Sequence, residues 1–209
     1  MKKADWYFDF ISPFAYIGLS RLDRFAGQLD IRLRPVLFAG LLNHWEQKGP
    51  AEIPGKRVWT YRWCTWLAGH LGIPFRSPAA HPFNPLPWLR LSIAAGNTPE
   101  AVTRIFEAIW TTGADAADEN HFKAVAASLG VDLARLADQA VKDALRAETD
   151  KAIGLGVFGV PTLVIDQELF WGADSMDFVA DYLADPGIVF TPEMQRAATL
   201  PVGVSRKKD

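Results

Sequence analysis

The chain has 209 residues, enough for one well-packed core or for a small domain with a second domain inserted into it. Hydrophobic residues make up 49% and charged residues 22%, and 22 basic residues against 24 acidic ones leave a net charge of -2. These values are ordinary for a globular protein. They give no strong charge field, so we expect neither nucleic acid nor a membrane as a partner.

Cysteine and histidine usage restricts the chemistry that the chain itself can perform. Cys64 is the only cysteine, which excludes an intrachain disulfide and a CxxC redox pair. The four histidines are scattered and form no HxxxH pair, so we expect no metal site. The N-terminus has no cleavage signal and no window of 18 apolar residues occurs, which with the cysteine usage predicts a cytoplasmic protein. Eight tryptophans predict an aromatic core or an aromatic ligand pocket.

The first forty residues predict a strand, a helix and a second strand. Residues 4–11 alternate, with three aromatic side chains on one side. Ser12 suits a helix N-cap and Pro13 the first helical position, and apolar residues then recur at helical spacing up to Gly27. Residues 31–38 alternate again, so this opening is a βαβ unit with a right-handed crossover.

The middle of the chain, from Leu41 to about Gly156, is predicted to be helical. Trp59, Trp63 and Trp66 recur at spacings of four and three, which favours packing in the core or in a dimer over ligand binding. Cys64, on the same helix, is expected to be a small buried hydrophobe. A loop broken by prolines is expected at 81–85, and helices are expected at 54–71, 86–95, 99–110, 118–129 and 132–147.

Strands return late, at residues 162–166 and 168–171, joined by a short Asp-Gln turn and followed by a helix over 174–183. Residues 186–209 are predicted to be an extended tail, with a solvated basic run at 206–208.

The order of elements predicts an α/β fold of thioredoxin-like type with an inserted α-helical domain. The outer βαβ and ββα parts would join into a four-stranded mixed sheet. The expected domains are a discontinuous thioredoxin-like domain, 1–40 and 157–209, and the helical insert, 41–156.

Two segments are candidates for chemistry. Ser12 lies where a strand ends and a helix begins; its hydroxyl either donates to an anion held at the helix end or only caps the helix. Pro161 directly precedes a strand, and is either a plain loop residue or a cis-proline that turns the backbone of Val160 toward an extended ligand. Thioredoxin-like proteins bring these segments together. Because residues 12–15 (SPFA) replace CxxC, the reactive sulfur is expected from a thiol cofactor.

Six stretches carry a resemblance to a known family: 9–16 (DFISPFAY), 35–38 (PVLF), 49–56 (GPAEIPGK), 82–85 (PFNP), 156–162 (GVFGVPT) and 170–174 (FWGAD). Over roughly residues 4–184 the chain resembles the DsbA-like glutathione enzymes, which comprise 2-hydroxychromene-2-carboxylate isomerases and kappa-class glutathione transferases. The proline loop and the Phe-Trp-Gly stretch look more like the isomerase branch.

The resemblance implies glutathione as cofactor. Ser12 looks like the residue that hydrogen-bonds the sulfur, and Val160, before Pro161, like the backbone partner of the cysteinyl part. Lys56 looks like the basic residue near the glycyl end; the alternative is a solvated helix charge. Gln47 stands where asparagine is common. The γ-glutamyl site is implied at the start of the last helix, on Trp171, Gly172, Ala173, Asp174 and Ser175.

Two alternatives accompany the γ-glutamyl site. Asp174 can instead be a helix cap, with Asp177 completing a partial capping box. Ser175 stands where the family often has arginine, so the contacts to glutathione differ in detail.

The substrate pocket is expected between the thiol and the helical insert. Arg90 either holds a carboxylate bidentately or is a surface charge. The candidate substrate-binding residues are Asn43, His44, Trp45, Asn84, Pro85 and Arg90.

The resemblance implies a glutathione-dependent isomerase of 2-hydroxychromene-2-carboxylate type, active in aromatic compound catabolism on a small-molecule aromatic carboxylate. The thiolate, stabilised by Ser12 and the helix end, would add to the substrate and permit cis-trans isomerisation. The alternatives are a kappa-like transferase or peroxidase, and a non-catalytic thioredoxin-like binding protein. The resemblance also implies a homodimer.

Overall fold

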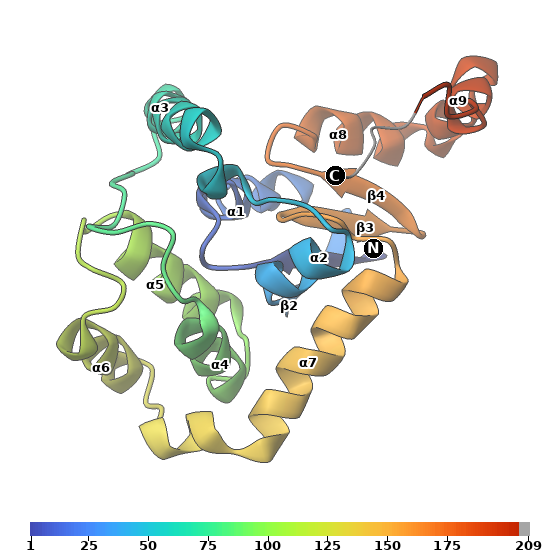
Figure 1. The fold of residues 1–209 in the computed structure, drawn as a ribbon. Coiled ribbons are helices and arrows are strands. Elements are labelled where there is room, and N and C mark those ends of the chain that lie inside the picture. Colours follow the sequence, from blue (N-terminus) through green and yellow to red (C-terminus); the bar gives the residue numbers. More distant parts are fainter. Residues whose placement is uncertain (205–209) are drawn as a thin grey trace.

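A four-stranded mixed sheet is built around β1 (Lys2–Phe8), which buries Trp6 and Phe8 on one face and Tyr7 on the other. The computed structural model describes residues 1–204. β1 pairs in parallel with β2 (Leu29–Pro35) and antiparallel with β3 (Thr162–Ile165), and β3 pairs antiparallel with β4 (Glu168–Trp171). The strand order is β2-β1-β3-β4, and the four-stranded mixed sheet expected from the sequence is confirmed (Figure 1).

Helices cover both faces of this sheet (Figure 1). Trp6 and Phe8 of β1 face the cluster that includes α1 and α8, whereas Tyr7 faces a smaller cluster under α2 and α7. The helices are α1 (Pro13–Leu19), α2 (Phe38–His44), α3 (Pro54–His70), α4 (Leu86–Ala94), α5 (Pro99–Trp110), α6 (Glu119–Ser128), α7 (Gln139–Gly154), α8 (Met176–Ala184) and α9 (Pro192–Ala198). Short 3₁₀ helices are η1 (Leu22–Phe25), η2 (Pro50–Glu52), η3 (Leu133–Ala137) and η4 (Pro186–Phe190).

The helices α3 to α7, which follow one another between β2 and β3 and are called the helical insert below, share their core with the sheet. Phe106 of α5 lies 5.6 Å from the ring of Phe8 and 4.7 Å from that of Phe10, measured between centroids. α7 then runs from the insert back to the sheet (Figure 1), where Arg34 pairs with Glu148 at 2.9 Å. The proposed division at residues 41 and 156 stays a prediction.

The first strand and helix are shorter than predicted. β1 ends at Phe8 because the carboxylate of Asp9 accepts the N–H groups of Ile11 and Phe38, which turns the chain out of the ladder. α1 ends at Leu19, and the predicted continuation to Gly27 is instead η1. The Ser20 hydroxyl donates to the carbonyl of Ile17, a local bond that competes with helix continuation.

Two further boundaries are wrong in the prediction. β2 spans Leu29–Pro35 and not 31–38, because Pro35 offers no N–H and Phe38 already begins α2. The helix predicted over 132–147 is η3 followed by α7, which extends to Gly154. Asp138 separates them with an extended backbone (ψ 135°).

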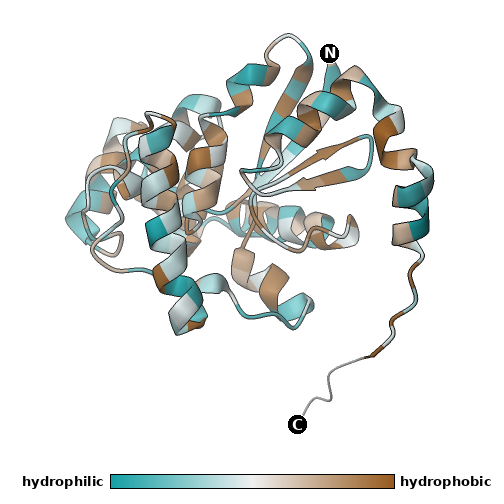
Figure 2. Ribbon diagram, turned by 90° about the horizontal axis from the view of Figure 1, so that it is seen from above, coloured by the Kyte–Doolittle hydropathy of each residue, from teal (hydrophilic) through white to brown (hydrophobic). Residues whose placement is uncertain are grey.

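The C-terminal segment also differs from its prediction. Residues 186–198 form η4 and α9, not an extended tail, and Figure 2 shows α9 projecting from the body. Thr191 caps α9 by accepting the Met194 N–H, and Pro192 occupies the first helical turn. The predicted basic run 206–208 lies outside the described residues.

The remaining predicted elements are present. The β3–β4 hairpin turns at Asp166 and Gln167, both with positive φ as a type I′ turn requires. Cys64 is fully buried, as predicted.

The three tryptophans of α3 do not pack in the core. Trp59 and Trp66 are 65% and 56% exposed, so the core-packing alternative for Trp59, Trp63 and Trp66 is wrong. Their rings stack on one another, with Trp63 in the middle. Within residues 1–204 no helix combines the length and apolarity needed to cross a membrane.

Candidate active site

Ser12 occupies the junction between β1 and α1. Its Oγ accepts the Ala15 N–H at 3.2 Å, so the predicted capping role is confirmed. The same Oγ lies 3.4 Å from the carbonyl of Val160. An O–H donor usually sits at about 2.7 Å from its acceptor, so this hydroxyl can turn to a closer acceptor, such as a sulfur anion.

The Val160–Pro161 peptide bond is cis, so of the two alternatives left open by the sequence the cis-proline is the correct one. Among the described residues, none accepts the N–H of Val160. The Pro161 carbonyl accepts the Gly172 N–H at 2.8 Å, which continues the β3–β4 pairing up to the loop. The backbone of Val160 therefore offers a free donor beside Ser12, as an extended peptide ligand would need.

An aromatic wall stands beside this loop. The indole of Trp171, 55% exposed, covers Gly159 so closely that a Cβ there would come within 2.6 Å of its Nε1. Phe158 packs edge-on against Trp171, with ring centroids 5.1 Å apart. Phe158 has no predicted role, and the only signal for it in the sequence is an aromatic residue three positions before Pro161.

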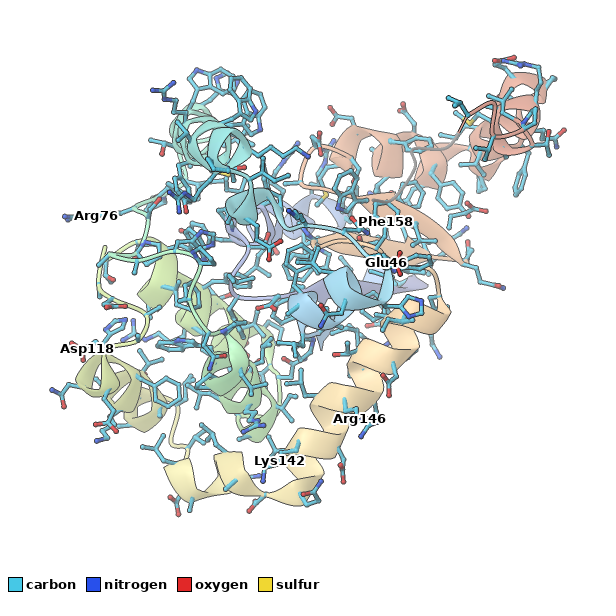
Figure 3. All side chains as sticks on the ribbon, viewed as in Figure 1. Glu46, Arg76, Asp118, Lys142, Arg146 and Phe158 are labelled. Carbon is cyan, nitrogen blue, oxygen red and sulfur yellow. The ribbon has the colours of Figure 1, made fainter. Side chains whose placement is uncertain are left out.

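The segment between α2 and α3 is tied to the same loop. Trp45 donates its indole N–H to the Val157 carbonyl at 3.0 Å, and Gln47 donates its amide N–H to the Phe158 carbonyl at 3.2 Å. In Figure 3, Phe158 lies close to Glu46, the neighbour of both residues. Trp45 and Gln47 are thus brought to the candidate site, where the Oε1 of Gln47 has no hydrogen-bond donor among the described residues.

The start of α8 forms the other side of the site. Gly172 has a φ of 93°, and a Cβ there would collide with Oδ1 of Asp174, so this turn requires glycine. Ser175 is the N-cap residue, and its hydroxyl donates to the Gly172 carbonyl at 2.8 Å. The capping-box alternative for Asp174 is wrong, because Asp177 pairs with Arg24 and Asp174 is not the cap. The Asp174 carboxylate stays exposed.

Asp9 is a buried carboxyl three residues before Ser12. Its oxygens accept the N–H of Phe38 at 2.8 Å and that of Ile11 at 3.1 Å. Burial raises the pKa of Asp9 to about 7, although the backbone N–H donors by themselves lower this pKa. No sequence signal singles out Asp9, because its burial depends on the tertiary fold.

Cys64 cannot supply the reactive sulfur. It is fully buried in α3, and burial raises the pKa of its thiol to about 12. Only the thiolate is a good nucleophile, so Cys64 is inert at neutral pH. Within residues 1–204 no group of three His, Cys, Asp or Glu side chains is arranged to hold a metal ion.

The other predicted residues are less directly connected to Ser12. Lys56 is exposed in the first turn of α3. His44 packs edge-on against Trp45, while Asn43 is exposed. No contact joins Lys56, His44 or Asn43 to Ser12 within the described residues, so their roles stay predictions.

The proline loop is anchored beside Ser12 by His81. The His81 ring lies 2.8 Å from the Ile11 carbonyl. The Asn84 side chain accepts the Leu86 N–H at the start of α4, whose N-cap residue is Pro85. Arg90 follows on α4 with a buried Nε that has no partner in the described part of the chain. No contact connects Arg90 with Ser12, so its role as a carboxylate clamp stays a prediction.

Comparison with known proteins gives a consistent picture. The family model for DsbA-like thioredoxin domains matches residues 3–184. A 2-hydroxychromene-2-carboxylate isomerase of Sphingobium xenophagum is 31% identical over 196 residues, covering 88% of this chain and 99% of that protein. Glutathione s-transferase kappa 2 of Caenorhabditis elegans is 31% identical over 209 residues, covering 88% of this chain and 93% of that protein.

Structural similarity agrees on the fold. The solved structure of a 2-hydroxychromene-2-carboxylate isomerase superposes with a TM-score of 0.76 at 24% identity, and the match covers 95% of this chain and 100% of that one. The resemblance inferred from the six sequence stretches is thereby confirmed. The chain belongs to the family of DsbA-like thioredoxin domains.

Proposed function

We propose that the chain is a glutathione-dependent isomerase of the 2-hydroxychromene-2-carboxylate type, acting on a small aromatic carboxylate in aromatic compound catabolism. One observation carries the proposal: Ser12 replaces the redox cysteine, and its hydroxyl faces the Val160 carbonyl across the cis-proline loop. The relatives named as isomerases, at 30% and 31% identity, support this reading.

The residues present fit glutathione. The free N–H of Val160 would pair with the cysteinyl backbone, and the Ser12 hydroxyl would donate to the sulfur. The exposed Asp174 would hold the γ-glutamyl ammonium, and Lys56 the glycyl carboxylate. When bound, glutathione supplies the nucleophilic thiolate that the chain itself lacks.

The chain's own residues would bind, orient and exclude water. Ser12 holds its hydrogen toward the sulfur and thus favours the thiolate form. The indole of Trp171 and the ring of Phe158 give the substrate an apolar wall. Arg90, with its unpaired Nε, is the proposed partner of the substrate carboxylate.

Substitution of Ser12 by alanine tests the proposal. We expect kcat for turnover of 2-hydroxychromene-2-carboxylate to fall on the order of 10²-fold, as for loss of one transition-state donor. Thr98→Ala is the matched control, because Thr98 caps α5 in the same way, accepting the Ala101 N–H at 3.2 Å. Both variants lose a cap, at about 1 kcal/mol of stability. An Ser12→Ala rate as high as that of Thr98→Ala would contradict the assignment.

A kappa-like transferase or peroxidase is the second candidate, favoured by the 31% identity to the kappa 2 transferase. Turnover of the chromene substrate, followed spectroscopically and compared with conjugation of an electrophile, separates the two activities. Calorimetry with glutathione addresses the third alternative. A non-catalytic thioredoxin-like protein that binds other partners would give no heat of binding with glutathione.

We further propose that the protein is a cytoplasmic homodimer. A reducing compartment keeps glutathione in its thiol form. Cys64 is the single cysteine of the sequence, so the chain forms no internal disulfide that would need an oxidising compartment. The exposed indoles of Trp59 and Trp66 on α3 support an interface with a second copy.

A further inference from the structure

The peptide group that joins Ile11 to Ser12 is held at both ends. The Ser12 N–H donates to the Asp9 carbonyl at 3.1 Å. On the other side the Ile11 carbonyl accepts from Nε2 of His81 at 2.8 Å. A peptide group is planar, so fixing its N–H and its C=O fixes its orientation. Since α1 fixes the chain directly after Ser12, the orientation of this peptide group then sets the direction of the Ser12 Cα–Cβ bond.

The tautomer of His81 follows from its partners. A carbonyl oxygen only accepts, so Nε2 carries the hydrogen that points to Ile11. Nδ1 then accepts the hydroxyl hydrogen of Tyr61, whose oxygen lies 2.8 Å away. The Tyr61 oxygen also lies 3.0 Å from the His81 carbonyl, so its single hydrogen is shared between two acceptors of His81, of which Nδ1 is the nearer. Burial lowers the pKa of His81, opposed by the bond to the Ile11 carbonyl and assisted by Arg57, which favours the neutral ring at neutral pH.

This arrangement reaches Ser12 from the helical insert. Tyr61 lies on α3, and His81 lies in the loop between α3 and α4. A parallel bond runs from the Trp110 indole of α5 to the Phe10 carbonyl, at 2.9 Å. The His81 ring packs edge-on against Trp110 with centroids 5.4 Å apart. Consecutive carbonyls before Ser12 are therefore fixed by side chains from outside the sheet.

We propose that Tyr61 and His81 are positioning residues for Ser12: they fix the Ile11–Ser12 peptide and so aim the Ser12 hydroxyl at the glutathione sulfur. The inference rests on the proposed glutathione site. Tyr61 donates to Nδ1 of His81 and so keeps the ring hydrogen on Nε2. His81 then donates that hydrogen to the Ile11 carbonyl. Neither side chain is required to touch glutathione or the substrate.

The test compares His81→Leu, which removes the donor, with His81→Gln, whose amide N–H can replace Nε2. The readout is the thiolate absorbance of enzyme-bound glutathione, titrated with pH, together with kcat and the KM for the chromene substrate. In His81→Leu we expect the thiolate fraction at neutral pH and kcat each to fall roughly tenfold, with KM within about twofold. His81→Gln recovers most of both, and Tyr61→Phe gives a smaller loss.

His121→Leu is the matched control. His121 makes the same kind of bond, from Nε2 to the Ala108 carbonyl at 3.1 Å, on α6 of the insert. Its loss costs stability but leaves the thiolate titration unchanged. The inference is overturned if His81→Leu titrates like the wild type, if His121→Leu shows the same loss, or if His81→Gln recovers nothing. A wild-type protein that shows no thiolate absorbance at saturating glutathione overturns the proposed function as well, which separates the two failures.

Discussion

At the scale of single residues, the site depends on where buried backbone groups find partners. Asp9 accepts N–H groups from Ile11 and Phe38, which lie far apart in the sequence. An unpaired buried N–H costs about 1–3 kcal/mol, so these bonds hold the turn before Ser12 in one conformation. The same carboxyl has its proton affinity raised by burial, which links the stability of this turn to pH.

Asp9 predicts a stability that decreases as the pH rises. Its pKa is about 7 in the folded chain, against an ordinary value of 3.8. Between these values the folded state keeps a proton that the unfolded chain has released. The free energy of unfolding therefore decreases with rising pH, by at most about 4 kcal/mol over the window. Urea unfolding from about pH 4 to about pH 8 measures this slope.

Asp9→Asn is expected to flatten that slope. The variant is also less stable overall, because its NH₂ group meets one of the two backbone N–H groups. Asp177→Asn is the control: Arg24, 2.8 Å away, holds the pKa of Asp177 below its ordinary value of 3.8, so Asp177 is ionised in both states above about pH 4 and its substitution should leave the slope unchanged. A slope that Asp9→Asn leaves unchanged would show that Asp9 is ionised throughout.

At the scale of elements, α7 fastens the insert to the sheet through one buried hydroxyl. Thr149 donates to the Leu145 carbonyl of its own helix at 2.9 Å and accepts the Leu37 N–H at 3.0 Å. Leu37 precedes α2, so this bond fixes where α2 begins. The ion pair between Arg34 and Glu148 lies one residue away on α7.

Thr149→Val should lower the free energy of unfolding by about 1–3 kcal/mol, because valine keeps the shape but leaves the Leu37 N–H without an acceptor. Equilibrium unfolding in urea measures the change. Thr111→Val is the control, since Thr111 donates to the Glu107 carbonyl but accepts no N–H, and its cost should stay below about 0.5 kcal/mol. Equal losses in the two variants would contradict the role of Thr149.

Element order could be predicted from the sequence, whereas several boundaries could not. The cap and proline at Thr98-Pro99 predict α5, yet the same signature at Thr191-Pro192 begins α9 without being recognised. The break at Asp138 has no comparable signal, since it depends on how η3 and α7 pack on α4.

The residues of the site also divide into those that local motifs predict and those that depend on long-range contacts. Ser12 and Val160 could be predicted because each lies in a local motif, a strand end followed by proline and a proline before a strand. His81 and Tyr61 could not, because the bond to Ile11 joins residues 70 apart in the chain. The packing of the helical insert brings His81 to the end of β1, and the spacing of residues in the sequence does not predict this contact.

At the scale of the whole molecule, α3 shows an apolar surface that a monomer leaves in water. Trp59 and Trp63 stack at 6.1 Å between centroids, and Trp63 and Trp66 at 5.1 Å. Each indole can bury about 150–250 Å² in an interface. Because Trp59 and Trp66 are 65% and 56% exposed, the two together would supply at most about 300 Å² of the roughly 800 Å² that each partner contributes to a stable interface.

The proposed homodimer therefore predicts that Trp59→Ser combined with Trp66→Ser dissociates the protein. Wild-type protein should sediment at twice the chain mass, and the double variant at the chain mass with its helical content unchanged, since both side chains are more than half exposed. Phe190→Ser is the control: Phe190 is 59% exposed on η4, away from α3, and its loss should leave the dimer intact. Sedimentation of the wild type as a monomer would refute the dimer. Dissociation by Phe190→Ser alone would move the interface from α3 to the C-terminal segment.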